Sequence, residues 1–325
     1  MLPDDLRSAL DQALARFSPQ ELADSVAQLT ERYRTGVSQG GNHLRSRADI
    51  AAYAAYRMPA TYAAGTTAMR HAAALTPGFE PRSHLDAGGG TGAAIWAASR
   101  IWPSIEKVTV IEHDQHIIDL GRRLARGSAA LRGATWRQAS VGAALDRPPA
   151  DLVTMSYALG ELPEPERPQV VRWLAGDAAM VVIIEPGTPA GYATITQARE
   201  VLTRTMSIVA PCPHDGACPI RQGRDWCHFS VRLPRTALHR RIKAGTLSFE
   251  DEKFAYVAAT ATPWPRPAAR VLRHPHKRKG VVSMRLCTET DGLRDEIVSK
   301  RQGDLYRLAR DVEWGDGWPT ITNAY

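Results

Sequence analysis

The feature that most constrains the fold of this chain is a glycine-rich loop between an apolar run and an amphipathic stretch. Residues 84–92 read HLDAGGGTG, preceding a predicted helix at Ala93–Ile101. Glycines at such a turn let the backbone bend sharply and approach a ligand without a Cβ clash. In a parallel α/β sheet, a loop of this kind lies at the carboxyl ends of the strands, where ligands bind. The loop therefore predicts both a fold class and the place of a site.

Apolar runs alternate with amphipathic stretches from residue 81 onward. The runs near 84–86, 108–111, 151–155 and 180–184 are typical of buried parallel strands, and the stretches between them are typical of crossover helices. Alternation of this kind predicts a doubly wound, Rossmann-like α/β sheet.

Three parts are expected along the chain. Residues 1–80 have a helical pattern, in which Met58-Pro59 should break or kink a helix. Residues 81–265 form the α/β core, which includes a cysteine-rich insertion at 207–235. A proline cluster then introduces a basic, β-rich extension at 266–325.

Two carboxylates beside the glycine loop help to choose between its possible cofactors. Gly88-x-Gly90-x-x-Ala93 also satisfies the relaxed dinucleotide fingerprint, so the glycines alone admit NAD as well as S-adenosylmethionine (SAM). Asp86 can face the ammonium group of SAM, whereas it would oppose the pyrophosphate of NAD. Glu112 ends the second strand and suits the ribose of either cofactor. A class I SAM methyltransferase fold is favoured over an NAD site or a vestigial, empty one. The expected cofactor-binding residues are Asp86, Gly88, Gly90, Gly92, Glu112 and Ser156.

The segment that normally faces the methyl acceptor in this fold carries no recognisable catalytic motif. Residues 156–162 (SYALGEL) lack the Asn/Asp-Pro-Pro-aromatic tetrapeptide of exocyclic amine methylation and the cysteine of carbon-5 pyrimidine methylation. Glu161 is the only plausible base there, and it could equally be structural. Whether the chain is an enzyme therefore stays open.

The four cysteines of the chain predict a metal site. Cys212, Cys218 and Cys227 lie in a loop rich in proline and glycine, and Cys287 follows 60 residues later on a predicted strand. Four thiolates suit either tetrahedral zinc or an iron–sulfur cluster, and a bound metal would order such a loop. Four unrelated structural thiols are the alternative. His214 and His228 could replace a cysteine as ligands, and spacing alone does not separate iron–sulfur from zinc.

Positive charge is concentrated in the last part of the chain. Residues 221–285 contain 15 Arg or Lys against four acids, within a chain of net charge +7. Such an excess attracts a polyanion, so RNA contact is favoured over a merely solvated basic face. No apolar run is long enough to span a membrane, and the acidic N-terminus is unlike a signal peptide or presequence, so we expect a cytoplasmic protein. The expected RNA contacts are Lys277, Arg278, Lys279, Lys300 and Arg301.

Several segments together resemble one family, the methyltransferase-like proteins associated with the small ribosomal subunit of mitochondria and bacteria. The resembling stretches are YRMPATYAA (56–64), HLDAGGGTGAAIWAA (84–98), SYALGELPEPER (156–167), IIEPGTPAGY (183–192), PCPHDGACPI (211–220), DWCHFSVRLPR (225–235), FEDEKFAY (249–256) and KRKGVVSMRLC (277–287). The resemblance implies a class I methyltransferase core and a role in small-subunit assembly. It also implies a 4Fe–4S cluster, with Cys212, Cys218, Cys227 and Cys287 as its ligands by position.

These observations together predict a SAM-binding, 4Fe–4S-containing protein that binds small-subunit rRNA and acts in ribosome assembly or translation. Methylation of the rRNA would be a further activity. The alternative is a small-molecule SAM-dependent methyltransferase with a structural zinc site. A monomer is the default expectation, although the sequence does not fix the oligomeric state.

Overall fold

The computed structural model describes residues 2–34, 46–142, 144–220, 225–235 and 247–319. Its helices are α1 (Asp4–Leu14), α2 (Pro19–Arg34), α3 (Arg47–Ala73), α4 (Ala93–Ile101), α5 (Gln115–Ala125), α6 (Arg167–Ala175), α7 (Pro189–Leu202) and α9 (Asp304–Asp311), with short 3-10 turns η1 (Leu159–Glu161), η2 (Glu164–Glu166) and η3 (Lys300–Gln302). The strands of the larger sheet are β1 (Ser83–Ala87), β2 (Lys107–Glu112), β3 (Thr135–Gln138), β4 (Leu152–Ser156), β5 (Met180–Pro186), β6 (Ser207–Ala210), β7 (Phe229–Pro234) and β8 (Phe249–Thr260). Those of the smaller sheet are β9 (Ala269–Val271), β10 (His276–Arg278), β11 (Val281–Thr288), β12 (Leu293–Ser299) and β13 (Gly317–Trp318).

The larger sheet has the strand order β3-β2-β1-β4-β5-β8-β6. The first five of these strands are parallel, and β8 runs antiparallel to each of its three partners, β5, β6 and β7. The order reverses between β1 and β4, so the loops after these two strands diverge and leave a crevice for a ligand. The predicted doubly wound α/β fold is confirmed, with β8 making the sheet mixed.

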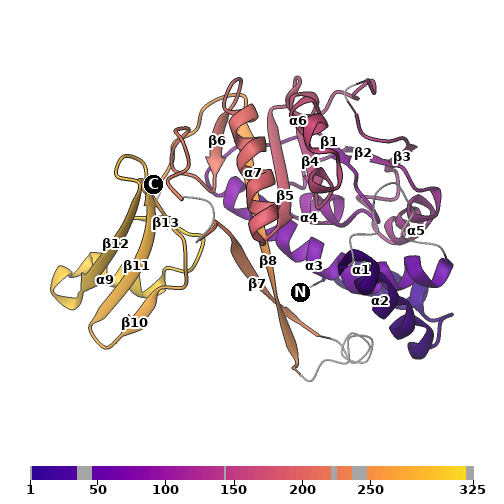
Figure 1. The fold of residues 1–325 in the computed structure, drawn as a ribbon, viewed down its shortest axis with the longest axis horizontal. Coiled ribbons are helices and arrows are strands. Elements are labelled where there is room, and N and C mark those ends of the chain that lie inside the picture. Colours follow the sequence, from indigo (N-terminus) through magenta and orange to yellow (C-terminus); the bar gives the residue numbers. More distant parts are fainter. Residues whose placement is uncertain (1, 35–45, 143, 221–224, 236–246, 320–325) are drawn as a thin grey trace.

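Helices cover both faces of this sheet, because alternate residues of its central strands point to opposite sides. Val182 and Ile184 of β5 belong to the core beneath α3, α4 and α5, whereas Val181 and Ile183 belong to the core beneath α6 and α7. The N-terminal helices α1 and α2 pack against α5 and α3, respectively (Figure 1). The helical region and the α/β core thus share one hydrophobic interior.

Helix α3 continues through Pro59, so of the two outcomes expected at Met58-Pro59 the break is wrong, while a kink stays a prediction. Proline inside a helix removes a hydrogen bond and costs about 3 kcal/mol or more. Here the residues on both sides of it, Met58 and Ala60, are buried at 1% and 3% exposure. We attribute the continuity to this burial, since packing along a helix of 27 residues offsets the local cost.

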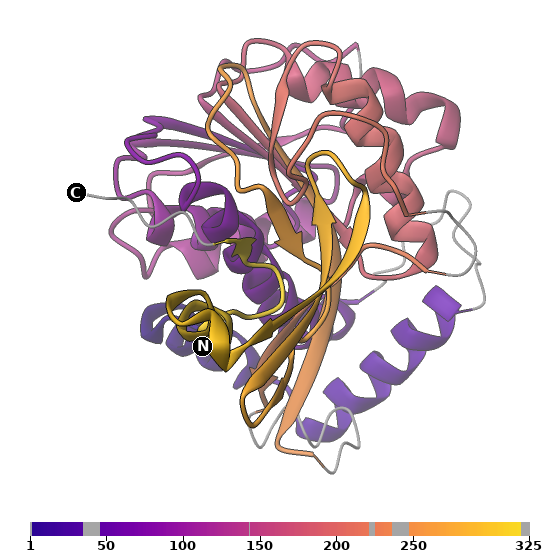
Figure 2. The same ribbon diagram turned by 90° about the vertical axis from the view of Figure 1, so that its left-hand side faces the viewer.

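The C-terminal part forms a second, smaller sheet with its own core. Its strand order is β10-β11-β9-β13, and β12 pairs with β11 along seven residues. Helix α9 packs on this sheet, which faces the viewer in Figure 2. The first half of β8 pairs with β7 as a two-stranded ribbon that projects from the larger sheet (Figure 1). No helix in the described ranges is both long and apolar enough to cross a membrane.

Candidate functional site

A pocket lies at the carboxyl ends of β1 and β4, under the glycine loop. Its walls come from the loop itself, from the end of β4 and from one side of α3. The lining residues are Tyr53, Arg57, Met58, Thr61, Asp86, Gly88, Gly89, Gly90, Thr91, Ala93, Ala94, Ser156 and Tyr157. Of the six residues expected to bind a cofactor, the structure brings together four here: Asp86, Gly88, Gly90 and Ser156.

Asp86 is the most unusual group in this pocket. Its side chain is fully buried, and its Oδ1 accepts a hydrogen bond of 2.7 Å from the Thr154 hydroxyl. Its Oδ2 and the neighbouring Ser156 Oγ have no hydrogen-bond partner. Burial raises the pKa of Asp86 to about 7, although the Thr154 hydrogen bond opposes this shift. A buried acceptor without a partner is costly, so these atoms suit a ligand that donates hydrogen bonds.

The glycine loop leaves room for such a ligand. Gly90 has φ +56°, and a Cβ placed on it would meet no atom within 4 Å. Gly89 is the opposite case, because its Cβ would lie 2.5 Å from Val110 Cγ1 and 2.6 Å from Asp86 Oδ2. The backbone at Gly89 must therefore approach the sheet closely, whereas the space above Gly90 is open.

Glu112 and Gly92 are placed differently from the other expected residues. The Glu112 carboxylate accepts hydrogen bonds from the backbone N–H groups of Gly90 (3.0 Å), His113 (2.8 Å) and Asp114 (3.1 Å). Burial raises the pKa of Glu112, but the His113 side chain, whose Nδ1 lies 2.8 Å from the carboxylate, and the backbone N–H groups of Asp114 and Gly90 outweigh it, and the net shift is downward. Glu112 thus holds the glycine loop in place, and its contact with a ribose stays a prediction. Gly92, with φ +90°, begins α4 as its N-cap.

The α3 side of the pocket was not predicted from the sequence. Arg57 lies over the Tyr157 ring at 4.9 Å and forms an ion pair of 3.7 Å with Glu252 of β8. The Tyr157 hydroxyl donates to Glu252 at 2.9 Å, and Tyr157 has φ +58°. Left-handed backbone at a tyrosine is strained and is often found at functional sites. The segment YRMPATYAA contains Arg57, but nothing in it shows that this helix faces the glycine loop.

The candidate base Glu161 ends η1 and does not line the pocket. Burial and the nearby Glu112 raise its pKa. Glu185, which sequence reasoning missed, is 3% exposed and accepts a hydrogen bond of 3.1 Å from the Gly160 N–H. Burial raises the pKa of Glu185 to about 7. Two carboxylates with raised pKa values therefore lie in or beside the segment that should face an acceptor, Glu161 within it and Glu185 in contact with it, and both are outside the pocket lining.

A second cavity is lined by all four cysteines. It lies between α7 and β8 of the core and β9 and β11 of the smaller sheet. Cys212, Cys218 and Cys227 come from the connection between β6 and β7, and Cys287 comes from β11. Burial and the other three cysteines raise the pKa of the Cys227 thiol. All four cysteines thus line one cavity, and their role as metal ligands stays a prediction.

The donor atoms around this cavity suit some metal groups better than others. No three His, Cys, Asp or Glu side chains of the described residues are arranged to hold a single metal ion. His214 Nε2 lies 3.7 Å from Cys287 Sγ, whereas His228 stacks on Trp226 and does not line the cavity. Two buried arginines, Arg199 and Arg270, line the cavity, and each has a side-chain nitrogen without a partner. Four thiols beside two such cations fit an anionic metal–thiolate group.

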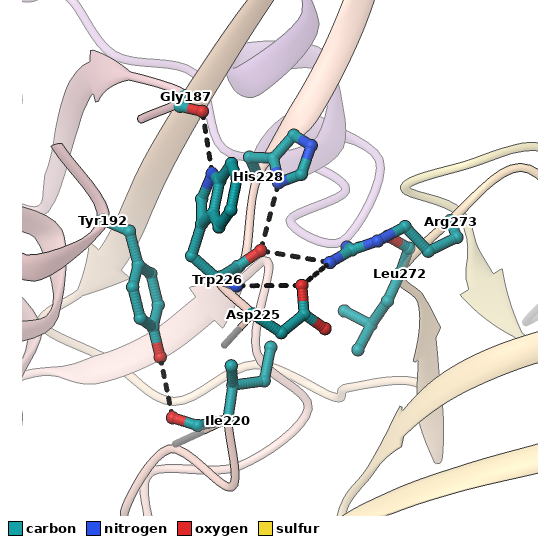
Figure 3. A network of polar contacts seen from close by, with 8 residues as sticks. All are labelled: Gly187, Tyr192, Ile220, Asp225, Trp226, His228, Leu272 and Arg273. Carbon is teal, nitrogen blue, oxygen red and sulfur yellow. Dashed lines mark hydrogen bonds and ion pairs between the residues drawn. The ribbon is translucent and has the colours of Figure 1, made fainter. Parts of the chain in front are cut away.

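A polar network holds the cysteine loop against its surroundings (Figure 3). Trp226 Nε1 donates to the Gly187 carbonyl at 2.8 Å, and the Tyr192 hydroxyl donates to the Ile220 carbonyl at 3.2 Å. The Arg273 guanidinium donates to Asp225 and to the Trp226 carbonyl, the latter at 3.2 Å. The loop is therefore tied to the core through Trp226 and Tyr192 and to the segment after β9 through Arg273.

The five expected RNA contacts are all exposed and gather at one end of the smaller sheet. Val281 of β11 is in register with Ser299 of β12, and the Lys300 N–H donates to the Gly280 carbonyl at 2.8 Å. Residues 277–279 and 300–301 therefore meet at the same corner, although about 20 residues separate them in the sequence. Lys277 forms an ion pair of 2.9 Å with Glu313.

The strand order, with an antiparallel strand inserted between β5 and β6, and the glycine-loop pocket together define a class I methyltransferase-like protein. The model of one family, described as mitochondrial small ribosomal subunit Rsm22, matches residues 47–319. The chain belongs to the Rsm22 family, and the resemblance seen in the sequence is confirmed.

Curated relatives include the human mitochondrial ribosome assembly protein METTL17, which is 28% identical over 83% of this chain and 62% of its own length. The Rsm22-cox11 tandem protein 2 of Schizosaccharomyces pombe is 26% identical over 72% of this chain and 38% of its own length. The chain thus spans less than two thirds of these relatives. They are named as mitochondrial proteins, so the expected cytoplasmic location is wrong.

Among solved structures, the chain is similar to magnesium protoporphyrin IX methyltransferase from Synechocystis, with a TM-score of 0.39, 14% identity and coverage of 72% of this chain and 91% of that one. The plantazolicin methyltransferase BpumL gives a TM-score of 0.40, 12% identity and coverage of 75% and 98%. Similarities this low carry no ligand or substrate over to the present chain.

Proposed function

We propose that this protein binds the RNA of the small ribosomal subunit and acts in the assembly of that subunit. In this proposal SAM occupies the glycine-loop pocket, and the four cysteines hold a 4Fe–4S cluster. One observation carries the proposal: the cysteine cavity lies between the methyltransferase-like core and the sheet that bears the basic corner. A metal group there would fix the RNA-facing surface relative to the core. The human relative is named for ribosome assembly, which agrees with this role.

SAM binding is supported by the unpaired atoms of the pocket. Asp86 Oδ2 and Ser156 Oγ are buried acceptors without partners, and the ammonium of the methionine moiety would supply donors. A carboxylate at this position would repel the pyrophosphate of a dinucleotide. NAD is therefore the less favoured cofactor.

A cluster is favoured over zinc because of the arrangement of the four thiols. Thiolates on one tetrahedral zinc lie about 3.8 Å apart, since each Zn–S bond is about 2.3 Å. The described side chains show no group of three ligands placed around a single metal ion, although all four cysteines line one cavity. In a 4Fe–4S cluster each thiolate binds a different iron atom, so the sulfur ligands are spread more widely. Such a cluster would cross-link the loop to β11, and its chemistry would be electron transfer or oxidation sensing.

RNA binding is supported by the basic corner formed by Lys277, Arg278, Lys279, Lys300 and Arg301. Their exposure leaves the ammonium and guanidinium groups accessible to phosphates. Because the glycine-loop pocket is on the core and the corner is on the smaller sheet, RNA bound at the corner need not enter the pocket. The assembly role thus does not depend on methyl transfer.

The test is a sedimentation profile of ribosomes from cells that lack this protein. We expect fewer mature small subunits, with recovery by the wild-type chain and no recovery by a chain in which the four cysteines are serine. A normal profile in cells that lack the protein would reject the assembly role. Mapping of modified nucleotides in the same cells decides about methylation, because a lost methyl group would make the protein an enzyme.

A further inference from the structure

Two buried arginines in the four-cysteine cavity lack the partners that buried charges require. Arg199 of α7 is 5% exposed and Arg270 of β9 is 3% exposed. Arg199 Nε and Arg270 Nη2 have no hydrogen-bond partner. No carboxylate appears among the described residues that line the cavity. A buried cation without an anion is expensive, so the described lining leaves an excess of positive charge that no carboxylate of that lining neutralises.

The two guanidinium groups are held in position by carbonyl oxygens. Arg199 Nη2 donates to the His214 carbonyl at 2.7 Å, and His214 lies between Cys212 and Cys218. Arg270 donates from Nε to the Pro211 carbonyl and from Nη1 to the Gly315 carbonyl, both at 2.7 Å. These bonds use only some of the five N–H donors of each guanidinium group and leave the others beside the thiols. Both arginines act electrostatically on Cys212 and Cys287.

We propose that Arg199 and Arg270 are positioning residues that neutralise an anionic metal–thiolate group and donate hydrogen bonds to its sulfur atoms. This inference rests on the proposed metal site and adds two residues that are not ligands. Four thiolates carry four negative charges, and either a zinc ion or an oxidised 4Fe–4S core returns about two positive charges. The two guanidinium groups balance the two negative charges that remain.

A consequence for a redox-active group follows from the same charges. Hydrogen bonds and positive charge near the sulfur atoms favour the reduced, more negative form of a cluster, so they raise its reduction potential. Loss of one arginine should therefore lower the potential and weaken retention of the group. A merely structural arginine would change neither quantity in a folded, loaded protein.

The test uses the full chain, purified without oxygen, and three substitutions. Arg199→Leu removes both charge and donors, Arg199→Lys keeps the charge, and Arg204→Leu is the matched control. Arg204 is exposed just beyond the end of α7, and no described residue forms an ion pair with it. Arg199 is preferred to Arg270 because Arg270 also holds two backbone segments. Iron, sulfide and zinc content, the rate of metal loss to a chelator, and the midpoint potential are measured.

We expect Arg199→Leu to lose its metal about 10- to 100-fold faster than wild type, the range typical of groups that support metal ligands. The midpoint potential should fall in the same variant, while Arg199→Lys recovers most of both quantities and the control matches wild type. Circular dichroism confirms folding. If Arg199→Leu does not fold, Arg199→Gln keeps an N–H donor for His214 and should show the same changes to a smaller degree.

The outcomes separate this inference from the proposed function. Wild-type protein with zinc and no iron would reject the cluster, and the arginines would then be judged by zinc retention alone. Wild-type protein without any metal would reject the metal site and the inference together. Loaded Arg199→Leu and Arg199→Gln proteins with wild-type retention and potential would overturn the inference while the metal site stands.

Discussion

The protonation state of Asp86 should make ligand binding in the glycine-loop pocket depend on pH. Its pKa in the folded protein, about 7, lies above its ordinary value of 3.8. A carboxyl group with a raised pKa stabilises the fold while it is protonated, and this contribution is lost as the pH rises through the folded pKa. A bound ammonium group reverses this preference because it favours the ionised form. SAM should therefore displace a proton from Asp86.

The first prediction is that SAM affinity rises with pH up to about 7, by at most about tenfold per pH unit, and then levels off. Calorimetry in buffers of different ionisation enthalpy should show proton release at about pH 6, where the unliganded carboxyl group is still protonated. Asp86→Asn should bind more weakly and lose this pH dependence, because it keeps the acceptor for Thr154 but cannot ionise. Proton release that persists in Asp86→Asn would assign it to another group, such as Glu185.

The second prediction concerns the open space above Gly90. Gly90→Val should abolish SAM binding, since its side chain would occupy that space and its positive φ would cost about 1–2 kcal/mol. Gly133→Val is the control, because Gly133 is exposed and its Cβ would also meet no atom within 4 Å, but without a positive φ. Isothermal titration of both variants is the measurement. SAM binding by Gly90→Val with unchanged affinity would exclude the loop as the cofactor site.

At the scale of elements, the corner between β10, β11 and η3 should carry much of the RNA affinity. Changing Lys279, Lys300 and Arg301 to Gln should weaken binding to small-subunit RNA and reduce its salt dependence by about one unit for each phosphate that is no longer neutralised. The control changes three exposed basic residues of the core, Lys107, Arg126 and Arg132. Filter binding over a range of salt concentrations compares the two triple variants. Equal weakening in both would show that total charge matters rather than this corner.

Four of the five parallel strands were predictable, because β2, β4 and β5 are runs of apolar residues and β1 leads into the glycine loop. β3 was missed, since its sequence TWRQ has one buried residue, Trp136, and no such run. The break expected at Pro59 was wrong because the sequence shows the energetic cost of a proline in a helix but not the burial of the residues around it. That the cysteines would lie together could be expected, because three of the four are in one loop rich in proline and glycine. The roles of Arg199 and Arg270 could not, because only the folded structure shows that both line one cavity and that each has a side-chain nitrogen without a partner.

At the scale of the whole molecule, the cysteine cavity lies where the larger and the smaller sheet meet, and we call this contact the joint between the two sheets. Three of its cysteines belong to the core and one, Cys287, to the smaller sheet. We predict that Cys287→Ser loses the metal, speeds hydrogen exchange in β9 and β11, and weakens RNA binding, while exchange in β1, β4 and β5 is unchanged. Cys212→Ser should behave alike, because it breaks the same joint from the other side. Retained RNA affinity in both metal-free variants would show that the corner works without the joint.

The unbroken helix α3 lines the glycine-loop pocket and contacts a residue that lines the cysteine cavity. Near its middle, Arg57 lines the glycine-loop pocket, and near its end His71 Nδ1 is hydrogen-bonded at 2.8 Å to the hydroxyl of Tyr256, which lines the cysteine cavity. A helix that Pro59 had broken could not transmit a displacement between these points. If occupancy of one site shifts α3, thermodynamic reciprocity requires that filling the other site change the first affinity by the same factor. The occupancy of the pocket by its cofactor and of the cavity by iron would then depend on each other through α3.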